Sequence, residues 1–310
     1  MPNQERGFVF ITVLLAITVL TTLLSVFLYS IQVEHTSRKT AQNRIQAQLI
    51  AQAGSIAAEK LVRFSLQDQN NSSISSFINT PFTYATPEGT VTVRITDESA
   101  LFPINSIILP DGTVHPTYMP IAERLCTNLK IPLSYLEAIS DWIDSDNQPR
   151  RGGAEAGWYQ SQPQPHTPRN SLLRSTEELN LVKDSTSYLT TLKPYITVYS
   201  EYGNNSSISL INLNTAPSAV LLALDQRMTE ALVERILEYR HTTPFKSVAE
   251  LAQVTGMSTI APSVQALLST SGSIFRITVQ ATVGKVIYTA ESVVRFSGAK
   301  TGNVLYWREY

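Results

Sequence analysis

The sequence predicts an α+β chain: a long N-terminal helix packs on an antiparallel sheet, and a large helical block is inserted between the strands of that sheet. Three observations predict this fold class. An apolar run from Phe8 to Val33 contains no charged residue, strand-like segments flank the centre of the chain, and the stretch between them contains an internal repeat of helical segments. With 310 residues, the chain is long enough for a membrane segment and one or two domains with their own cores.

The composition excludes several classes of function. Lys and Arg number 24 against 25 Asp and Glu, so the net charge of −1 gives no general attraction to nucleic acid or anionic lipid. The single cysteine, Cys126, excludes an intrachain disulfide and a cysteine-based zinc site.

The apolar run begins directly after Arg6-Gly7 and exceeds the roughly 20 residues that a helix needs to cross a bilayer. The short flank with Arg6 and the amino terminus favours an N-terminus in the cytoplasm. A cleaved signal peptide is the alternative, but its apolar region is about 7–15 residues long and precedes a small-x-small site. This run is longer and has no such site directly after it, so we expect a membrane anchor.

The segment Glu34–Leu66 has no proline and continues the helical pattern. Apolar residues recur there at spacings of three and four, as is typical of an amphipathic helix. They are Ile45, Leu49, Ala53, Ile56, Ala57 and Leu61. One helix from Phe8 to about Leu66 would be roughly 90 Å long. Two helices broken near Tyr29–Glu34 are the alternative.

A loop and three strand-like segments are predicted outside the helices. Asp68–Pro87 is rich in Asn, Ser and Thr and is predicted to be the loop. The following segment, 89–96, alternates apolar and polar residues, which predicts a half-buried strand. Ile274–Val283 and Val286–Phe296, joined by a Gly-Lys turn, predict a hairpin.

The block between these strands, about Leu101–Ser271, contains an internal repeat. The pattern S-x-x-E-L-x-x-V occurs from Ser175 and again from Ser247, and its Ser and Glu have the spacing of a helix capping box. A predicted helix precedes each copy, Leu136–Ile143 and Glu230–Tyr239, and an aliphatic-Asn pair precedes each helix. We interpret the block as two degenerate helical hairpins; chance similarity of two capped helices is the alternative.

The second copy is similar to the helix-hairpin-helix domains of DNA uptake and repair proteins, which bind phosphate through the backbone N–H groups of a Gly-x-Gly hairpin. Here the hairpin consists of Asp225, Gln226, Arg227 and Met228, without glycine and with a carboxylate where phosphate would lie. Residues 211–257 hold four basic and five acidic groups, so counterion release gives no advantage. The sequence predicts the scaffold without the DNA site.

An acidic loop follows the first of these helices. With Asp144 as position 1, its oxygen groups fall at positions 1, 3, 5, 7 and 12, the ligand positions of an EF-hand. The candidate ligands are Asp144, Asp146, Gln148, Arg150 through its carbonyl, and Glu155. Position 6 is Pro149 where an EF-hand has glycine. A Ca²⁺ site and a solvated acidic turn neutralised by arginines both stay open; a catalytic carboxylate pair is disfavoured because no nucleophile or second partner is evident.

Taken together, the Gly7 leader before an apolar helix, the D-W-x-D-x-D run from Asp141, the Gly153-Ala154-Glu155 triplet and the N-T-A-P run from Asn214 carry a resemblance. The chain resembles the minor pseudopilin K of type II secretion systems, the GspK family of type IV pilin-like proteins, over essentially its whole length.

The resemblance implies a domain organisation. A prepilin leader would occupy residues 1–7, the transmembrane helix 8–33, and a pilin-like helix with the first strands 34–100. The inserted helical domain would occupy 101–271, as two helix-hairpin-helix-like (SAM-like) repeats at about 101–200 and 208–271. C-terminal strands at 272–310 would complete the pilin sheet.

The resemblance also implies processing and position. Prepilin peptidase would cleave between Gly7 and Phe8, and Phe8 would become the methylated N-terminus. Most pilin-like subunits carry Glu at position five of the processed chain, which the K family lacks; that position here is Thr12. A subunit with no neighbour above it needs no such charge, and a buried unpaired carboxylate is costly. Thr12 and the bulk of the inserted domain therefore favour the tip of a filament.

We expect from the resemblance a single-pass inner-membrane protein with its N-terminus in the cytoplasm and its bulk in the periplasm. Its expected partners are the I and J minor pseudopilins, the major pseudopilin, prepilin peptidase and inner-membrane lipid, with no nucleic acid. Calcium sites in the family's helical domain support Ca²⁺ at the acidic loop.

The leading hypothesis is a structural protein without catalytic activity that initiates pseudopilus assembly and supports export across the outer membrane. The alternative is a membrane-tethered helix-hairpin-helix DNA-binding protein of a competence or type IV pilus system. A periplasmic metal-dependent hydrolase is a third, weaker hypothesis.

Overall fold

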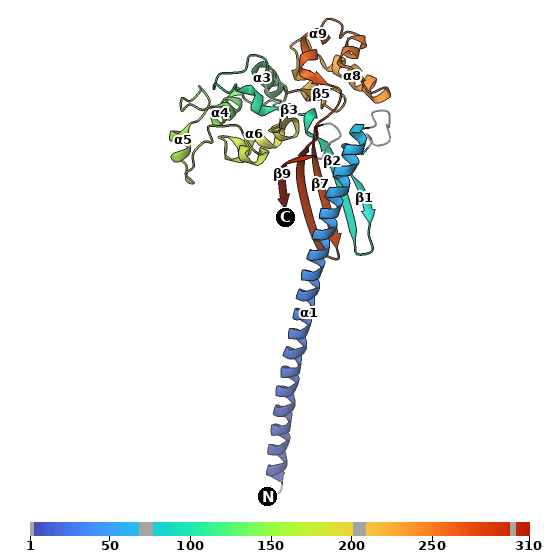
Figure 1. Cartoon of the computed structure of the whole chain (residues 1–310). Coiled ribbons are helices and arrows are strands. Elements are labelled where there is room, and N and C mark those ends of the chain that lie inside the picture. Colours follow the sequence, from blue (N-terminus) through green and yellow to red (C-terminus); the bar gives the residue numbers. More distant parts are fainter. Residues whose placement is uncertain (1–2, 68–76, 201–208, 298–301) are drawn as a thin grey trace.

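The computed structural model describes residues 3–67, 77–200, 209–297 and 302–310. One unbroken helix, α1 (Asn3–Gln67), forms a rod whose first half extends away from the rest of the chain. Its second half lies on a sheet, and the helical units sit at the end of the molecule opposite the N-terminus (Figure 1). The prediction of one continuous helix is confirmed, and the alternative of a break near Tyr29–Glu34 is wrong.

The sheet has five antiparallel strands in the order β1-β2-β7-β8-β9. They are β1 (Phe82–Ala85), β2 (Thr90–Asp97), β7 (Ile274–Val283), β8 (Val286–Arg295) and β9 (Asn303–Glu309). Because β2 pairs directly with β7, everything between them is an insertion into one sheet. The predicted fold class is confirmed, including the strand expected over 89–96, which is β2, and the C-terminal hairpin of β7 and β8.

Two strands of the sheet, β1 and β9, were not predicted from their own residues. β1 lies inside the segment expected to be a loop, of which residues 68–76 fall outside the described part. The strand has four residues at the edge of the sheet, and its side chains are mostly exposed. Such a short segment carries no periodic burial signal, and only pairing with β2 makes it a strand.

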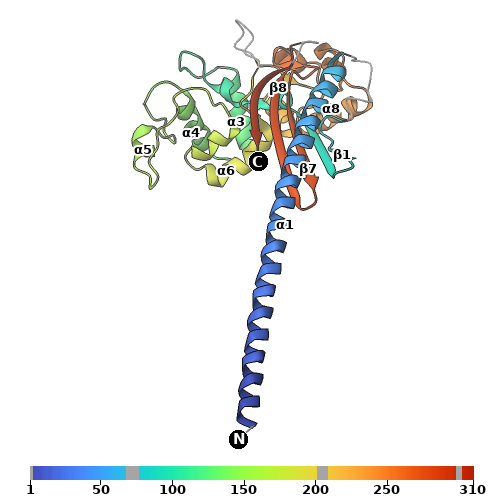
Figure 2. The same cartoon turned by 60° about the horizontal axis from the view of Figure 1, so that its bottom comes forward.

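The face of α1 that packs on the sheet is made of small residues, Ala47, Ala51, Ala58 and Val62, all at most 2% exposed. Of the large residues of the predicted amphipathic stripe, Ile45, Leu49 and Ile56 are 58–60% exposed, and only Leu61 is partly buried against the core of the sheet. Small side chains let the helix backbone approach the sheet closely. The periodicity of the large apolar residues therefore predicted an apolar face of the helix, but the face buried against the sheet is the one made of small residues. Figure 2 shows α1 crossing in front of the strands.

The inserted block forms two helical units. The short helix η1 (Glu98–Ala100) leads from β2 into the first unit. That unit contains β3 (Phe102–Pro103), η2 (Ile104–Ile107), α3 (Tyr118–Asn128), α4 (Leu133–Ile143), α5 (Ala156–Gln160), η3 (Thr176–Leu181), α6 (Ser185–Leu192), η4 (Lys193–Tyr195) and β4 (Ile196–Thr197). The second contains β5 (Ile211–Asn212), α7 (Ser218–Ala223), α8 (Glu230–Thr242), η5 (Val248–Gln253), α9 (Ala261–Val264), η6 (Gln265–Leu267) and β6 (Leu268–Ser269). Each unit is closed by a two-residue parallel pair, β3 with β4 and β5 with β6.

The two units repeat one structural device. Asn105 donates from Nδ2 to the carbonyl of Leu173 and accepts on Oδ1 from the N–H of the same residue, both at 2.9 Å. Asn214 makes the same pair with Phe245, at 2.9 and 2.8 Å. These are the two asparagines that the sequence repeat singled out, and each joins the start of its unit to the segment before the S-x-x-E-L pattern.

The prediction of two capping boxes is only partly confirmed. The segments that follow the two serines, η3 and η5, are 3₁₀ helices, and neither serine caps its own helix through the side chain. The glutamates do bend back, but one residue further than in a capping box. Glu178 accepts from the backbone N–H of Arg174 at 2.9 Å, and Glu250 from that of Lys246 at 3.0 Å.

Candidate cation site

The acidic loop connects α4 to α5 in the first unit. Asp144 is the first residue after α4 and has extended backbone angles, and Glu155 is the residue immediately before α5. The loop therefore runs from the end of α4 to the start of α5. It brings Asp144, Asp146 and Glu155 together, with one carboxylate oxygen of each within 4.8 Å of the others. These are positions 1, 3 and 12 of the predicted register.

Two of these three carboxylates are buried, where an uncompensated charge is costly, and that of Asp146 is exposed. Asp144 and Glu155 are 2% and 5% exposed. Among the described residues, no hydrogen-bond partner reaches Oδ1 of Asp144 or either carboxylate oxygen of Glu155. Burial, together with the charges of Asp141, Asp144 and Asp146, raises the pKa of Glu155 to about 7. Buried carboxylate oxygens of this kind fit a hard cation that prefers oxygen ligands.

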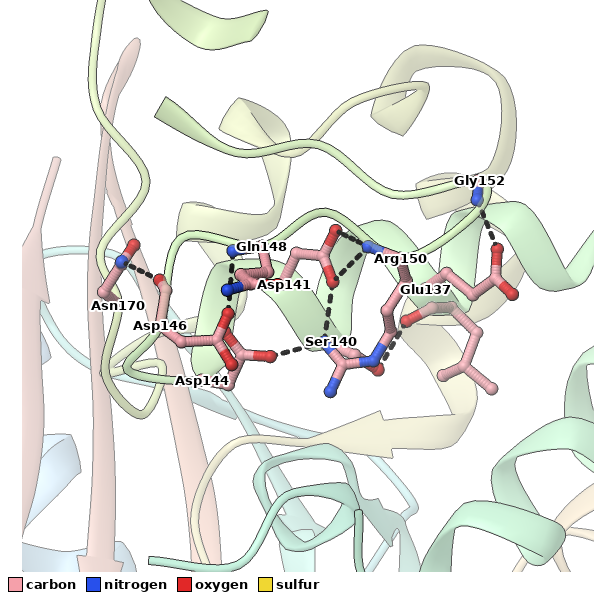
Figure 3. Close-up of polar contacts among 10 residues, drawn as sticks. Glu137, Ser140, Asp141, Asp144, Asp146, Gln148, Arg150, Gly152 and Asn170 are labelled. Carbon is pink, nitrogen blue, oxygen red and sulfur yellow. Dashed lines mark hydrogen bonds and ion pairs between the residues drawn. The ribbon is translucent and has the colours of Figure 1, made fainter. Parts of the chain in front are cut away.

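The structure uses the other two predicted ligands differently. The backbone N–H of Gln148 donates to Asp146 Oδ1 at 2.8 Å, while the residue itself is exposed. The carbonyl of Arg150 accepts from the N–H of Gly153 at 3.1 Å. The guanidinium of Arg150 reaches back to Asp141 and Asp144, as Figure 3 shows, a contact that the EF-hand register does not predict.

The loop has no glycine at position 6, but two later glycines, Gly152 and Gly153, let it pack closely against α4. A Cβ on Gly153 would lie 1.8 Å from Asp141 Oδ2, and one on Gly152 would lie 2.6 Å from the Ser134 Cβ. The N–H of Gly152 also donates to Glu137 at 2.7 Å (Figure 3). The chain can therefore close onto α4 only because these positions have no side chain.

Two contributors from other segments were missed by sequence reasoning. Asn170, which has a left-handed φ of 49°, donates from Nδ2 to the carbonyl of Asp146 at 2.6 Å (Figure 3). Lys183 donates from Nζ to the carbonyls of Gly152 and Gly153 at 3.1 and 3.2 Å. Neither residue carries a local signal, because both reach the loop only through the tertiary fold.

Comparisons with known proteins agree with the resemblance found in the sequence. Two models of type II secretion system protein K match residues 100–201 and 211–271, together more than half of the chain. The chain belongs to the type II secretion system protein K family. Its relatives include the type II secretion system protein K of Klebsiella pneumoniae, 26% identical over 99% of both chains. That of Pectobacterium carotovorum subsp. carotovorum is 26% identical over 97% of this chain and 95% of the relative.

A solved structure has the same fold. It is that of the GspK-GspI-GspJ complex from the enterotoxigenic Escherichia coli type 2 secretion system, with a TM-score of 0.68 and 20% identity. The match covers 88% of this chain and 99% of the solved one. In this chain the two family models match the two helical units, the part inserted between β2 and β7.

The degenerate hairpin of this family member connects α7 to α8. Arg227 donates to Asp225 from its backbone N–H and from two guanidinium nitrogens, at 2.7–2.9 Å. Arg227 and Ser263 hold the pKa of the Asp225 carboxyl well below its usual range. A fixed carboxylate at this place opposes phosphate, which argues against a DNA-binding role. Gln226 and Met228 complete the turn, and the N–H of Met228 donates to the carbonyl of Asp225.

The residues tied to processing lie near the start of α1. Gly7 and Phe8 are within the helix, and Thr12 donates from Oγ1 to the carbonyl of Val9 at 2.8 Å, so its hydroxyl is satisfied within its own helix. From Phe8 onward α1 is long and apolar enough to cross a membrane, and its apolar stretch is exposed. This fits a single-pass anchor.

Proposed function

We propose that this chain is the minor pseudopilin at the tip of the type II secretion pseudopilus, where it initiates assembly and supports protein export across the outer membrane. The observation that carries the proposal is the position of the two helical units at the end of the molecule opposite the N-terminus (Figure 1). A subunit inside a shaft needs room above it for the next subunit. Here that room is filled by the two helical units, which the structure describes over residues 98–200 and 209–273 between β2 and β7.

Thr12 supports the same position. The hydroxyl of Thr12 is bonded within α1 and needs no partner from a neighbouring subunit. A glutamate at this depth would need the terminal amine of a neighbouring subunit to neutralise it. A subunit without a neighbour above it has no such amine. The role is structural, without catalysis.

The membrane arrangement follows from α1. The N-terminus lies in the cytoplasm, prepilin peptidase cleaves between Gly7 and Phe8, and Phe8 becomes methylated. The following apolar helix spans the inner membrane, and the sheet and helical units lie in the periplasm. Mass spectrometry of the mature chain tests this arrangement: an N-terminal methylated Phe8 supports it, and retention of Met1 in a working system contradicts it.

The partners are other membrane-anchored pseudopilins. A complex with I and J subunits is supported by the fold shared with the GspK chain solved in such a complex, and the exposed apolar half of α1 offers a surface for their helices. Contact with the major pseudopilin follows if these three subunits start the filament.

We also assign Ca²⁺ to the acidic loop as part of this function. Asp144, Asp146 and Glu155 supply carboxylate oxygens, and Gln148 and the Arg150 carbonyl lie in the same loop. When bound, the ion supplies positive charge and fixed coordination that tie the end of α4 to the start of α5. The chain's own residues prepare the loop, through Gly152 and Gly153 against α4 and Asn170 against Asp146.

The decisive experiment locates the protein on a fibre. In a type II secretion strain that lacks its own protein K and overproduces the major pseudopilin, an epitope tag at the exposed C-terminal Tyr310 is labelled with gold. The proposal predicts label at one end of each fibre and restored secretion into the medium. Label distributed along the shaft, or normal fibre initiation without the protein, overturns it. A Thr12→Val variant is expected to retain secretion and a Thr12→Glu variant to reduce it.

A gel-shift assay tests the alternative. Since Asp225 holds a negative charge at the hairpin, the chain is expected to show no salt-sensitive DNA binding near micromolar concentrations. Such binding would favour a competence or pilus role instead.

A further inference from the structure

A single guanidinium nitrogen lies between two buried carboxylates at the candidate cation site. Nη1 of Arg150 is 2.6 Å from Asp141 Oδ1 and also pairs with Asp144 Oδ2 (Figure 3). The side chains of Asp141 and Asp144 are 0% and 1% exposed, and that of Arg150 is 24% exposed. This is a desolvated ion triad rather than a surface salt bridge.

The two oxygens of Asp144 have different surroundings. Oδ2 pairs with Arg150, while Oδ1 is buried and has no hydrogen-bond partner among the described residues. A ligand oxygen of Asp144 also lies within 4.8 Å of those of Asp146 and Glu155. One carboxylate can therefore face the guanidinium with one oxygen and a metal ion with the other, since carboxylate ligands commonly carry a second hydrogen bond.

The position of Arg150 is fixed by its backbone. Its N–H donates to both oxygens of Asp141, at 3.1 and 3.3 Å. The following glycines close against α4, where the N–H of Gly152 reaches Glu137. The guanidinium is thus held by the same closure that forms the loop.

We propose that Arg150 is the resident counter-cation of the acidic loop: it neutralises Asp141 and Asp144 when no metal is bound, and it orients Asp144 so that Oδ1 faces the ion when one is bound. This inference rests on the cation site assigned under the proposed function. It makes Arg150 a positioning residue whose side chain, and not its carbonyl alone, sets how far the loop depends on metal.

The physical reason is the cost of buried charge. Asp141, Asp144, Asp146 and Glu155 place four carboxylates around one loop, and removing one partner of a buried pair leaves an uncompensated charge. Without Arg150 a bound ion is the main source of positive charge there, although Lys183 donates to the carbonyls of the two glycines. The loop should then fold only with metal, as metal-dependent loops do.

The test compares Arg150→Met with Arg151→Met in the full chain, purified in detergent. Arg151 is the adjacent, exposed arginine and serves as the matched control. Thermal unfolding is followed in EGTA and in excess Ca²⁺. In EGTA the Arg150→Met variant is expected to melt about 10 °C below the control, and Ca²⁺ should recover most of this difference. Its Ca²⁺-induced shift should exceed that of the wild type.

A double variant keeps the test interpretable if Arg150→Met folds poorly. Asp144→Asn with Arg150→Met removes one of the two charges that the guanidinium neutralises, so stability in EGTA should return part of the way toward the control while the Ca²⁺-induced shift is lost. Equal melting of Arg150→Met and Arg151→Met in EGTA would overturn the inference and leave the cation site standing. Absence of any Ca²⁺-induced shift in the wild type, with Arg150→Met still destabilised, would instead reject the cation site and leave Arg150 as a permanent counter-ion.

Discussion

The carboxylate of Asp97 accepts a hydrogen bond from the side-chain amide of Asn212 at 2.7 Å, joining the end of β2 to the start of the second helical unit. Thr215 donates to the same oxygen at 2.6 Å, and Gly272 lies so close that a Cβ there would be 2.5 Å from Asp97. Thr215 belongs to the N-T-A-P run that carries the family resemblance, so this run, together with Asn212, also docks the inserted units onto the sheet.

Asn212→Ala is expected to destabilise the chain by about 1–3 kcal/mol, because it leaves a buried carboxylate short of a donor. Denaturant unfolding of the full chain in detergent measures the change. Ser218→Ala, at the exposed start of α7, is the control and should stay within about 0.5 kcal/mol of the wild type. Equal stabilities for the two variants would show that the docking contact contributes nothing.

Asp97 should also give the chain a specific pH dependence. Burial raises the pKa of Asp97, although hydrogen bonds from Thr215, Asn212 and Ser99 oppose the shift. Between the unfolded-state pKa near 3.8 and the higher folded-state pKa, the folded chain holds a proton that the unfolded chain has lost. The free energy of unfolding therefore falls as pH rises from about 4 through the folded-state pKa.

Asp97→Asn removes this component, so the difference in unfolding free energy between wild type and variant should change with pH in that window. Unfolding series from pH 4 to pH 8 provide the measurement. A difference that stays constant over the whole series would mean that Asp97 has an ordinary pKa.

Glu155→Gln should reduce Ca²⁺ affinity by at least about tenfold, since even changes beyond the direct ligands cost 10–100-fold. Metal-free stability should not fall, because a neutral amide replaces a buried carboxylate whose oxygens lack partners among the described residues. Calorimetric titration with Ca²⁺ measures the affinity. Glu123→Gln on the exposed surface of α3 is the control, and identical affinities for both variants would contradict the assignment.

The two faces of α1 should respond oppositely to substitution. Leu49→Ser with Ile56→Ser is expected to change stability by no more than about 0.5 kcal/mol per site, because both side chains are exposed, but to weaken association with partner pseudopilins. Ala51→Leu, on the fully buried face, should cost about 1–3 kcal/mol through overpacking. Unfolding and co-purification with the I and J subunits separate the two effects. Unimpaired co-purification of the double variant would exclude this face as the contact.

Part of the candidate site could be predicted from spacing alone. Asp144, Asp146 and Glu155 lie within one loop between two helices, so a register counted along the chain identified the three carboxylates that the structure brings together. The same counting could not give the orientation of the Arg150 side chain, because an EF-hand register assigns only its carbonyl. Nor could it find Asn170, which is 24 residues from Asp146 in the chain.

The sequence by itself predicted the helix from Phe8 to about Leu66 that makes up most of α1, the strands β2, β7 and β8, and the repeat marked by Asn105 and Asn214, since periodicity and local motifs are properties of neighbouring residues. Only the tertiary structure decided which face of α1 is buried, that Phe82–Ala85 forms an edge strand, and that Asp97 meets Asn212 across 115 residues of chain. The physical reason is that burial and hydrogen bonding between distant segments depend on which surfaces the fold brings together, and no spacing along the chain records that.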